Sequence, residues 1–290
     1  MRVPMQPNIE PFSLLDYYIT SVLIGVRSLP SRYLREALAR ILNPLSYPRF
    51  MEYEIVLDQL ELSDGCRVLD VGSPKLPTLL LARRANCELY STDIRDYFIG
   101  STSHFLRLAG FGKRLGQNLH LETQDARKLS YPDDSFDRAF SISVIEHIPE
   151  DGDSHAMREI ARVLRPGGLL TLTVPFAANG YEEEWVNGGV YERQDGGPTF
   201  YQRRYDVAEL HRRLIEPSGL RLVEATYFGE PGVRFEPFWN RIPLRWKIPL
   251  LWTQPFLARL FLRRLRDYEI EAACGVALKL EKGPRAAAVR

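Results

Sequence analysis

The sequence is poor in cysteine, carries almost no net charge and has no long apolar run. Its three cysteines, Cys66, Cys87 and Cys274, are scattered and lack the spacing of a metal site. This argues against a disulfide framework, so we expect core thiols of a reduced, cytoplasmic protein. A formal net charge of +1 excludes bulk attraction to nucleic acid, which needs a clear excess of lysine and arginine.

Signals for secretion, membrane insertion and metal binding are also missing. The apolar stretch at residues 12–26 is short and is interrupted by Asp16, Thr20 and Gly25, so it does not predict a membrane span. Residues 1–11 contain three prolines and no apolar run, and we expect no signal peptide there. No cluster of metal ligands is evident, so we predict no bound metal.

What is present is an ordinary globular composition, with 45% hydrophobic and 26% charged residues. A chain of 290 residues can bury a sizeable core, which favours one large domain with extensions. We expect a helical extension or lid at 1–62, a core at 63–230 completed by 269–282, an insertion at 231–268 and a disordered tail at 283–290.

Strand-like and helix-like segments alternate from residue 66 onward. Strands are predicted at 66–71, 87–92, 118–123, 136–142, 168–174, 220–228 and 271–281, with helices at 76–85, 153–164 and 206–216. Three more helices are predicted before them, at 12–26, 31–42 and 49–62. The alternation predicts an α/β fold with a doubly wound, mostly parallel sheet of seven strands.

An acidic residue follows each of the first three predicted strands. Asp70 ends the first strand and is followed by a turn at Gly72, and Asp93 stands 93 − 70 = 23 residues further on. Nucleotide-binding folds place an acid on ribose hydroxyls at about this offset. Asp125 follows the third strand, where a carboxylate can accept from an adenine amine. One acid alone often caps a helix, but three in this pattern predict a nucleoside-binding edge.

Two further segments carry a family resemblance together with these acids. They are DDSFDRAFSISVIEHIPE at 133–150 and VLRPGGLLTLTVP at 163–175. The chain resembles a class I S-adenosylmethionine-dependent methyltransferase of the methyltransferase type 11, or quinone-biosynthesis-like, group. The resemblance covers roughly 66–228 and a last strand near 271–281. It implies a Rossmann-like sheet with an antiparallel final strand, and S-adenosylmethionine as cofactor with S-adenosylhomocysteine as product.

The resemblance also implies a role for each matching residue. Asp70 and the backbone of Gly72 would hold the methionine end of the cofactor, Asp93 the ribose, and Asp125 with Ala126 the adenine. Ser141 and Ile142 would border the cofactor beneath its methyl group. The full predicted cofactor-binding set is Asp70, Gly72, Ser73, Asp93, Ile94, Asp125, Ala126, Ser141 and Ile142.

The turn after the first strand departs from the family pattern. Pro74 and Leu76 stand where the family usually has further glycines, and this stiffens and narrows the loop. S-adenosylmethionine brings no pyrophosphate to the turn, so one glycine can suffice. The competing interpretation is an NAD-dependent dehydrogenase, which the single glycine and the Asp125-Ala126 pair make less favourable.

His147 is the predicted general base, because it follows the fourth strand near the methyl end of the cofactor. The alternative is that it caps a helix or braces the strand. The long segment 175–205 is expected to shape the acceptor site, or else to form a packed surface flap. Ser141-Ile142-Ser143-Val144 lacks the Asn-Pro-Pro-aromatic signature of nucleic-acid adenine methylases. The predicted acceptor-binding residues are Tyr181, Trp185, Tyr201, Arg204 (or Arg203) and Tyr205.

The segment before the last strand is basic and apolar. No acid occurs from Pro237 to Arg266, whereas seven bases do, and three of the four tryptophans lie there. After Thr253 the pattern predicts a helix with Phe256, Leu257, Leu260, Phe261 and Leu265 on one face and Arg259, Arg263 and Arg266 opposite. We expect either peripheral membrane contact through 238–266 or packing on the N-terminal helices or in a homodimer.

The sequence thus predicts a cytoplasmic methyltransferase of a small, apolar or lipid-like acceptor, with methylation at oxygen favoured over carbon or nitrogen. The alternative is a pseudoenzyme or scaffold that binds the cofactor and is recruited to membranes or partners by the basic insertion.

Overall fold

The computed structural model describes residues 12–84, 86–108, 110, 112, 113, 115, 117–189 and 197–284. The prediction that the first eleven residues carry no signal peptide lies outside this range. So does most of the predicted disordered tail, from residue 285 onward.

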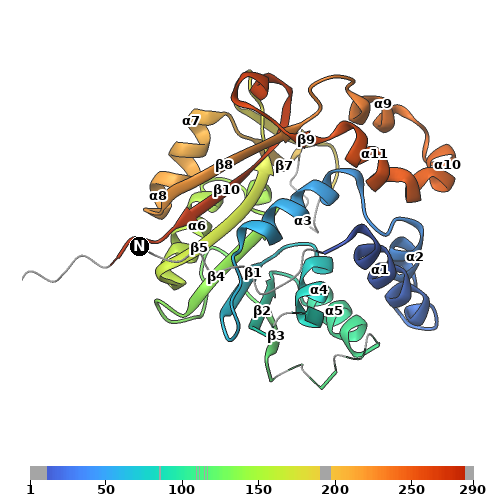
Figure 1. The fold of residues 1–290 in the computed structure, drawn as a ribbon, viewed down its shortest axis with the longest axis horizontal. Coiled ribbons are helices and arrows are strands. Elements are labelled where there is room, and N and C mark those ends of the chain that lie inside the picture. The colour runs from blue at the N-terminus through green and yellow to red at the C-terminus, as the bar shows by residue number, and fades with distance from the viewer. Residues whose placement is uncertain are drawn as a thin grey trace, which may run out of the picture.

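A single large sheet crosses the molecule, with the strand order β3-β2-β1-β4-β5-β10-β8-β9 (Figure 1). The first five of these strands are parallel neighbours, whereas β10 runs antiparallel between β5 and β8. The α/β, doubly wound prediction is confirmed, including the antiparallel last strand. The strands are β1 (Arg67–Val71), β2 (Glu88–Asp93), β3 (Leu119–Thr123), β4 (Phe136–Ile142), β5 (Leu164–Pro175), β8 (Arg221–Gly229), β9 (Arg263–Arg264) and β10 (Ala273–Glu281).

Each of the seven predicted strands has its counterpart, and the two-residue β9 adds an eighth from within the insertion. Successive side chains of a strand point to opposite faces, so Val68 joins one hydrophobic core and Leu69 the other. Both faces are therefore buried, as a parallel sheet requires. One core is completed by α1 (Leu14–Ser28), α3 (Tyr47–Gln59), α4 (Lys75–Arg84) and α5 (Asp96–Leu108), the other by α6 (Gly152–Val163) and η2 (Leu210–Ile215).

The predicted N-terminal helices are α1, α2 (Leu34–Leu42) and α3. Helix α1 begins with a capping box. The Ser13 side chain accepts a hydrogen bond from the amide of Asp16, and the Asp16 carboxylate accepts one from the amide of Ser13. Helix α3 packs across β4, β5 and β10. Helix η2, a π-helical segment, is flanked by the short helices α7 (Val207–Glu209) and α8 (Glu216–Ser218) and occupies the predicted helix at 206–216.

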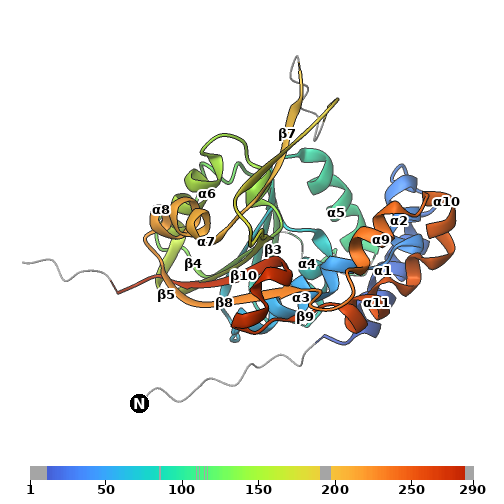
Figure 2. The same ribbon diagram turned by 90° about the horizontal axis from the view of Figure 1, so that it is seen from above.

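The insertion lies beside α1 and α2 at one end of the molecule (Figure 2). It contains α9 (Phe235–Arg241), α10 (Leu244–Lys247), η3 (Ile248–Thr253) and α11 (Gln254–Phe261), and η4 (Asp267–Ala272) follows it. The prediction that one helix face after Thr253 extends to Leu265 is wrong. Helix α11 ends at Phe261, and the extended backbone of Leu262 leads into β9. Leu257 and Phe261 pack inward, whereas Phe256 and Leu260 are exposed.

The segment predicted as a long loop contains a β-hairpin. Its strands are β6 (Glu182–Val186) and β7 (Thr199–Arg204), which pair antiparallel and project from the body of the molecule (Figure 2). The base of this hairpin joins the end of β5 through the pairing of Phe176 with Tyr205. The hairpin therefore stands at the carboxyl end of β5, beside the edge where the predicted cofactor residues lie.

Candidate cofactor and acceptor site

Asp70 holds the turn after β1 together. Its carboxylate is fully buried and accepts hydrogen bonds from the hydroxyls of Thr78 and Ser91 and from the amide of Ser73. These donors come from β2, from α4 and from the turn itself. These hydrogen bonds of Asp70 are directed at the turn, and they order the backbone that the resemblance assigns to the cofactor.

Lys75 links two of the predicted acids and was missed in the sequence. Its Nζ lies 3.5 Å from Oδ2 of Asp70 and 3.9 Å from Oδ2 of Asp93, and it donates to the carbonyl oxygen of Thr92 at 2.8 Å. Burial raises the pKa of Asp93, and the nearby Lys75 opposes that shift. The only sequence signal was the lysine inside the turn that lacks the usual glycines.

The turn after β1 and the end of β4 are joined by direct hydrogen bonds. Ser141 Oγ donates to the carbonyl oxygen of Val71 at 3.0 Å, and the amide of Ile142 donates to Ser73 Oγ at 3.0 Å. Gly72 between them has φ +70°, a left-handed conformation that favours glycine. The predicted residues Gly72, Ser73, Ser141 and Ile142 are therefore brought together, while their role toward a cofactor stays a prediction.

The predicted ribose and adenine residues lie at the carboxyl ends of β2 and β3. The amide of Gln124 donates to the carbonyl oxygen of Asp93, so the two strand ends are adjacent. Ile94 is 59% exposed beside the partly buried Asp93, an arrangement that suits a diol on a carboxylate and a ring on an apolar side chain. Asp125, next to the predicted Ala126, pairs with Arg127, which lowers the pKa of that carboxyl.

A buried polar cluster lies beyond the ends of β4 and β5. Ser143 Oγ donates to Glu52 Oε1 at 2.5 Å, and Arg49 donates to Glu52 Oε2 at 2.6 Å. Glu146 is 1% exposed, and its Oε2 has no hydrogen-bond partner within the described part of the chain. Burial raises the pKa of Glu146 to about 8. Glu146 was detectable as the acid next to His147, whereas Glu52 lies on α3, outside any motif.

The predicted base, His147, is held between the hairpin and this cluster. Its Nδ1 lies 2.8 Å from the carbonyl oxygen of Tyr201, and its Nε2 lies 3.7 Å from Oε1 of Glu146. A carbonyl oxygen can only accept, so Nδ1 carries a proton, and in the neutral ring Nε2 is the unprotonated nitrogen. This geometry is compatible with both predicted roles, bracing the strand and accepting a proton.

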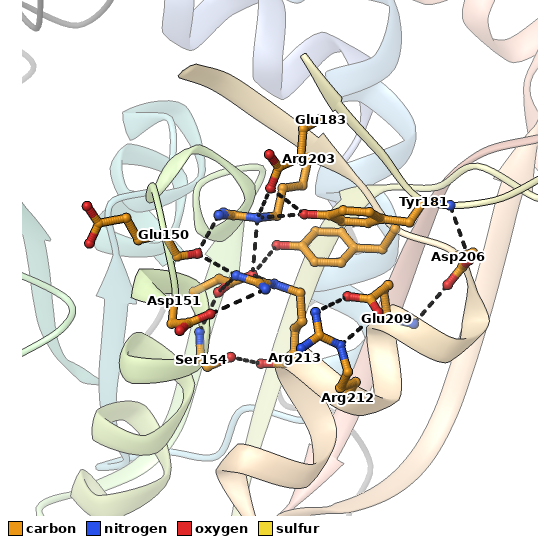
Figure 3. A network of polar contacts seen from close by, with 12 residues as sticks. Glu150, Asp151, Ser154, Tyr181, Glu183, Arg203, Asp206, Glu209, Arg212 and Arg213 are labelled. Carbon is orange, nitrogen blue, oxygen red and sulfur yellow. Dashed lines mark hydrogen bonds and ion pairs between the residues drawn. The ribbon is translucent and has the colours of Figure 1, made fainter. Parts of the chain in front are cut away.

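The predicted acceptor residues divide into buried and exposed ones. Tyr205 is fully buried, and its hydroxyl donates to Asp153, so it packs in the core instead of walling an open site. Tyr181 donates to Glu183 and accepts from Arg203, which is itself 1% exposed (Figure 3). These contacts build the base of the hairpin.

The remaining predicted acceptor residues lie on the hairpin strands. Tyr201 contacts the ring of His147 at 5.1 Å between centroids, which keeps it beside the candidate base. Trp185 is 54% exposed and packs edge-on against Phe200. The Nε of Arg204 is buried without a hydrogen-bond partner within residues 197–284 or the other described ranges.

No metal centre accompanies these groups in the described ranges, where no three His, Cys, Asp or Glu side chains gather as metal ligands would. A hollow of about 290 Å³ does border the turn after β1. It lies between Pro74, Lys75 and Leu76 on one side and the N-terminal helices on the other.

Comparison with known proteins identifies the core. The family model described as "Methyltransferase domain" matches residues 69–172. Three relatives illustrate the matches. Methyltransferase GfsG of Streptomyces halstedii is 30% identical over 191 residues, 65% of each chain. Sterol 24-C-methyltransferase of Yarrowia lipolytica is 27% identical over 158 residues, 52% of this chain and 40% of that one. The 27-O-demethylrifamycin SV methyltransferase of Amycolatopsis mediterranei is 47% identical over 114 residues, which are 39% of this chain and 40% of that one.

These alignments cover less than two thirds of each relative's length. Among solved structures, coclaurine N-methyltransferase bound to N-methylheliamine and S-adenosylhomocysteine has the same fold, with a TM-score of 0.55 over 94% of this chain and 88% of that one at 13% identity. The match and the sheet order agree with each other: residues 69–172, from β1 into β5, match a methyltransferase domain.

Proposed function

We propose that this chain transfers the methyl group of S-adenosylmethionine to an oxygen atom of a small apolar or lipid-like acceptor. The cofactor supplies an electrophilic methyl group on a sulfonium. The protein then has mainly to align the acceptor and exclude water. For a hydroxyl acceptor it must also remove a proton.

The Glu146–His147 pair is the observation that carries the choice of oxygen. With Nδ1 on Tyr201, Nε2 is the nitrogen of His147 that would take the proton of an acceptor hydroxyl. Glu146 lies 3.7 Å from that nitrogen, and a positive charge formed on the imidazole would favour ionisation of this carboxyl. The raised pKa of Glu146 also lets this carboxyl hold a proton near neutral pH.

The relatives support the acceptor class without fixing the acceptor. One is named for the O-methylation of a rifamycin and another for the C-methylation of a sterol. The two names differ in the atom that receives the methyl group. Methylation at carbon would not require His147 to deprotonate a hydroxyl. A role of the Glu146–His147 pair in proton removal therefore distinguishes methylation at oxygen from methylation at carbon.

Calorimetry with S-adenosylhomocysteine tests the proposal. The wild-type chain should bind it, and Asp93→Ala should abolish binding, because the ribose would lose its carboxylate. Asp58→Ala, on the exposed side of α3, is the matched control and should bind like wild type. No binding by the wild-type chain would overturn the proposal. The acceptor itself can be sought by comparing metabolites made with and without the protein, looking for pairs separated by one methylene.

We also propose that the N-terminal helices and the insertion together dock on an anionic membrane. Three stripes of large apolar side chains, each spaced by four residues, are between 40% and 73% exposed. Such stripes on neighbouring helices form a continuous apolar patch larger than isolated surface residues make. The stripes are Leu15, Ile19 and Leu23 on α1, Leu34, Leu38 and Leu42 on α2, and Trp252, Phe256 and Leu260 on η3 and α11.

The three stripes belong to packed neighbours. The indole of Trp252 donates to the carbonyl oxygen of Ile41 at the end of α2, and its ring lies 5.5 Å from that of Tyr18 on α1. Figure 2 shows α1, α2 and the insertion gathered at the same end of the molecule.

Charge favours a lipid surface over a second copy of the chain. Four cations of the insertion have no carboxylate partner among the described residues: Arg241, Arg245, Lys247 and Arg259. A base near an anionic bilayer contributes roughly 1 kcal/mol, whereas a homodimer would bring these cations toward one another. In the described ranges no helix has the length and apolar character needed to cross a bilayer, so any docking would be peripheral.

A further inference from the structure

The hollow beside the turn after β1 has an unusual wall. Helices α1, α2 and α3 contribute Ser21, Arg40, Arg49 and Tyr53, and Lys75 comes from the start of α4. Three of these five side chains are cations, and no carboxylate lines the hollow. A concave surface lined by cations favours an anionic ligand.

Arg40 is the cation without a counter-charge. Arg49 is paired with Glu52, and Lys75 lies close to Asp70, but the guanidinium of Arg40 has no ion pair or hydrogen bond with any described residue. It lies over the face of Phe105, 4.5 Å from the ring centroid. Burial lowers the pKa of Arg40 to about 10, so the group is still charged at neutral pH.

Tyr53 adds a second unsatisfied donor. The residue is 3% exposed, yet its hydroxyl forms no hydrogen bond with the rest of the described chain. Burial raises the pKa of Tyr53, so the hydroxyl keeps its proton and can donate it. The hydroxyl of Tyr53 and the guanidinium of Arg40 border the same hollow, so both donors can serve an acceptor bound there.

The position of the hollow indicates which acceptor is missing. Its floor is Pro74 and Lys75, immediately after the turn that the family uses for the methionine end of the cofactor. Proline has no backbone N–H, so this turn offers one donor fewer to a bound anion than a glycine would. Side chains from α2 and α3 can supply the donors that the turn lacks.

We propose that Arg40 and Tyr53 bind the carboxylate at the methionine end of S-adenosylmethionine. The inference rests on the proposed function and adds that the N-terminal helices complete the cofactor site. A guanidinium fork and a hydroxyl match the two oxygens of a carboxylate. The N-terminal extension is then part of the site, in addition to covering the sheet.

Two ligands that differ in the amino-acid portion test the assignment by calorimetry. S-adenosylhomocysteine carries the carboxylate, whereas 5′-methylthioadenosine keeps the nucleoside and thioether but lacks it. Arg40→Met retains the stem that lies over Phe105 and removes the charge. It should weaken S-adenosylhomocysteine binding about 10- to 100-fold and leave 5′-methylthioadenosine binding unchanged. Tyr53→Phe should act in the same direction with a smaller effect.

Arg35→Met is the matched control, because Arg35 lies on the same helix, is exposed and does not line the hollow. It should bind both ligands like wild type. Equal losses for both ligands in Arg40→Met, or no loss for either, would overturn the inference while the proposed function stands. An absence of S-adenosylhomocysteine binding in wild type would instead overturn the proposed function. If the hollow instead binds a carboxylate of the methyl acceptor, Arg40→Met would bind S-adenosylhomocysteine like wild type. That is the case of no loss for either ligand, and it overturns the inference.

Discussion

The guanidinium of Arg213 forms two hydrogen bonds with the carboxylate of Asp153, at 2.7 Å from Nε to Oδ2 and 2.8 Å from Nη2 to Oδ1. The same carboxylate accepts from Tyr205 at 2.9 Å and lies 3.8 Å from the Nε of Arg203. One buried acid therefore ties α6 and η2 to the base of the hairpin, within the network in which Figure 3 labels Arg203 and Arg213. Since the hairpin holds His147 through Tyr201, this network positions the candidate base from a distance.

Arg213→Met should destabilise the chain by about 3 kcal/mol, because the buried carboxylate of Asp153 loses its two-bond partner and keeps only the more distant Arg203 as counter-charge. Arg212, the next residue, offers a matched control, since its side chain is 58% exposed in its pair with Glu209. Arg212→Met should change the free energy of unfolding by no more than about 0.5 kcal/mol. Denaturant unfolding of both variants measures the difference, and equal stabilities would contradict the role given to the Asp153–Arg213 pair.

The central strands were predictable from sequence because they are largely buried on both faces. Short apolar runs such as Val68 to Val71 are typical of strands in parallel sheets, and their order followed from the alternation with helices. Helix α5 was missed, since Gly100, Ser101 and Thr102 in its middle weaken the apolar pattern. The end of α11 was placed too late, because Leu262 to Arg266 continue an amphipathic spacing that pairing of β9 with β8 overrides.

Glu146 should make stability depend on pH. The folded carboxyl, with its pKa raised to about 8, keeps a proton that the unfolded chain releases near its ordinary value of 4.5. Between these values the folded state binds more protons, so stability falls as pH rises. Glu146→Gln should remove this dependence of stability on pH. Relative to wild type, its free energy of unfolding should rise toward pH 8 by on the order of 3 kcal/mol.

Thermal unfolding of wild type and Glu146→Gln from pH 5 to pH 8 measures that effect. Glu150→Gln, an exposed neighbour on the same loop, should keep the wild-type slope. If wild type and Glu146→Gln lose stability in parallel over this range, Glu146 is not the group responsible.

Gly72 should be intolerant of a side chain for two separate reasons. Its φ of +70° is strained for other residues, and an added Cβ would lie 2.8 Å from Cγ1 of Val144. Gly65 has a similar φ of +75° but nothing within 4 Å of such a Cβ, so it isolates the backbone cost. Gly65→Ala should cost about 1 kcal/mol, and Gly72→Ala about 1 to 3 kcal/mol more. Only Gly72→Ala should weaken S-adenosylhomocysteine binding, and calorimetry of both variants checks this.

The candidate site was predictable where it follows strand ends and unpredictable where it comes from elsewhere in the chain. Asp70, Asp93 and Asp125 follow strands whose order the fold rules give. Arg40 and Glu52 come from helices before the first strand, and no local pattern states which face of the sheet such helices cover. Tyr205 has the aromatic character of an acceptor wall, but its burial depends on Asp153, 52 positions away.

Membrane docking should depend on both the apolar stripes and the unpaired cations. The full chain is expected to float with vesicles that contain anionic lipid, and less well with neutral vesicles or at high salt, because screening weakens the attraction of bases to the surface. Replacing Phe256 and Leu260 by Glu removes apolar contact and adds like charge to that of the lipid, so flotation should be lost. Val207→Glu, at a similarly exposed apolar residue on α7, is the control and should float like wild type. A chain that stays with the soluble fraction at low salt, and whose mass in solution doubles with concentration, would show instead that the stripes join two copies of the protein.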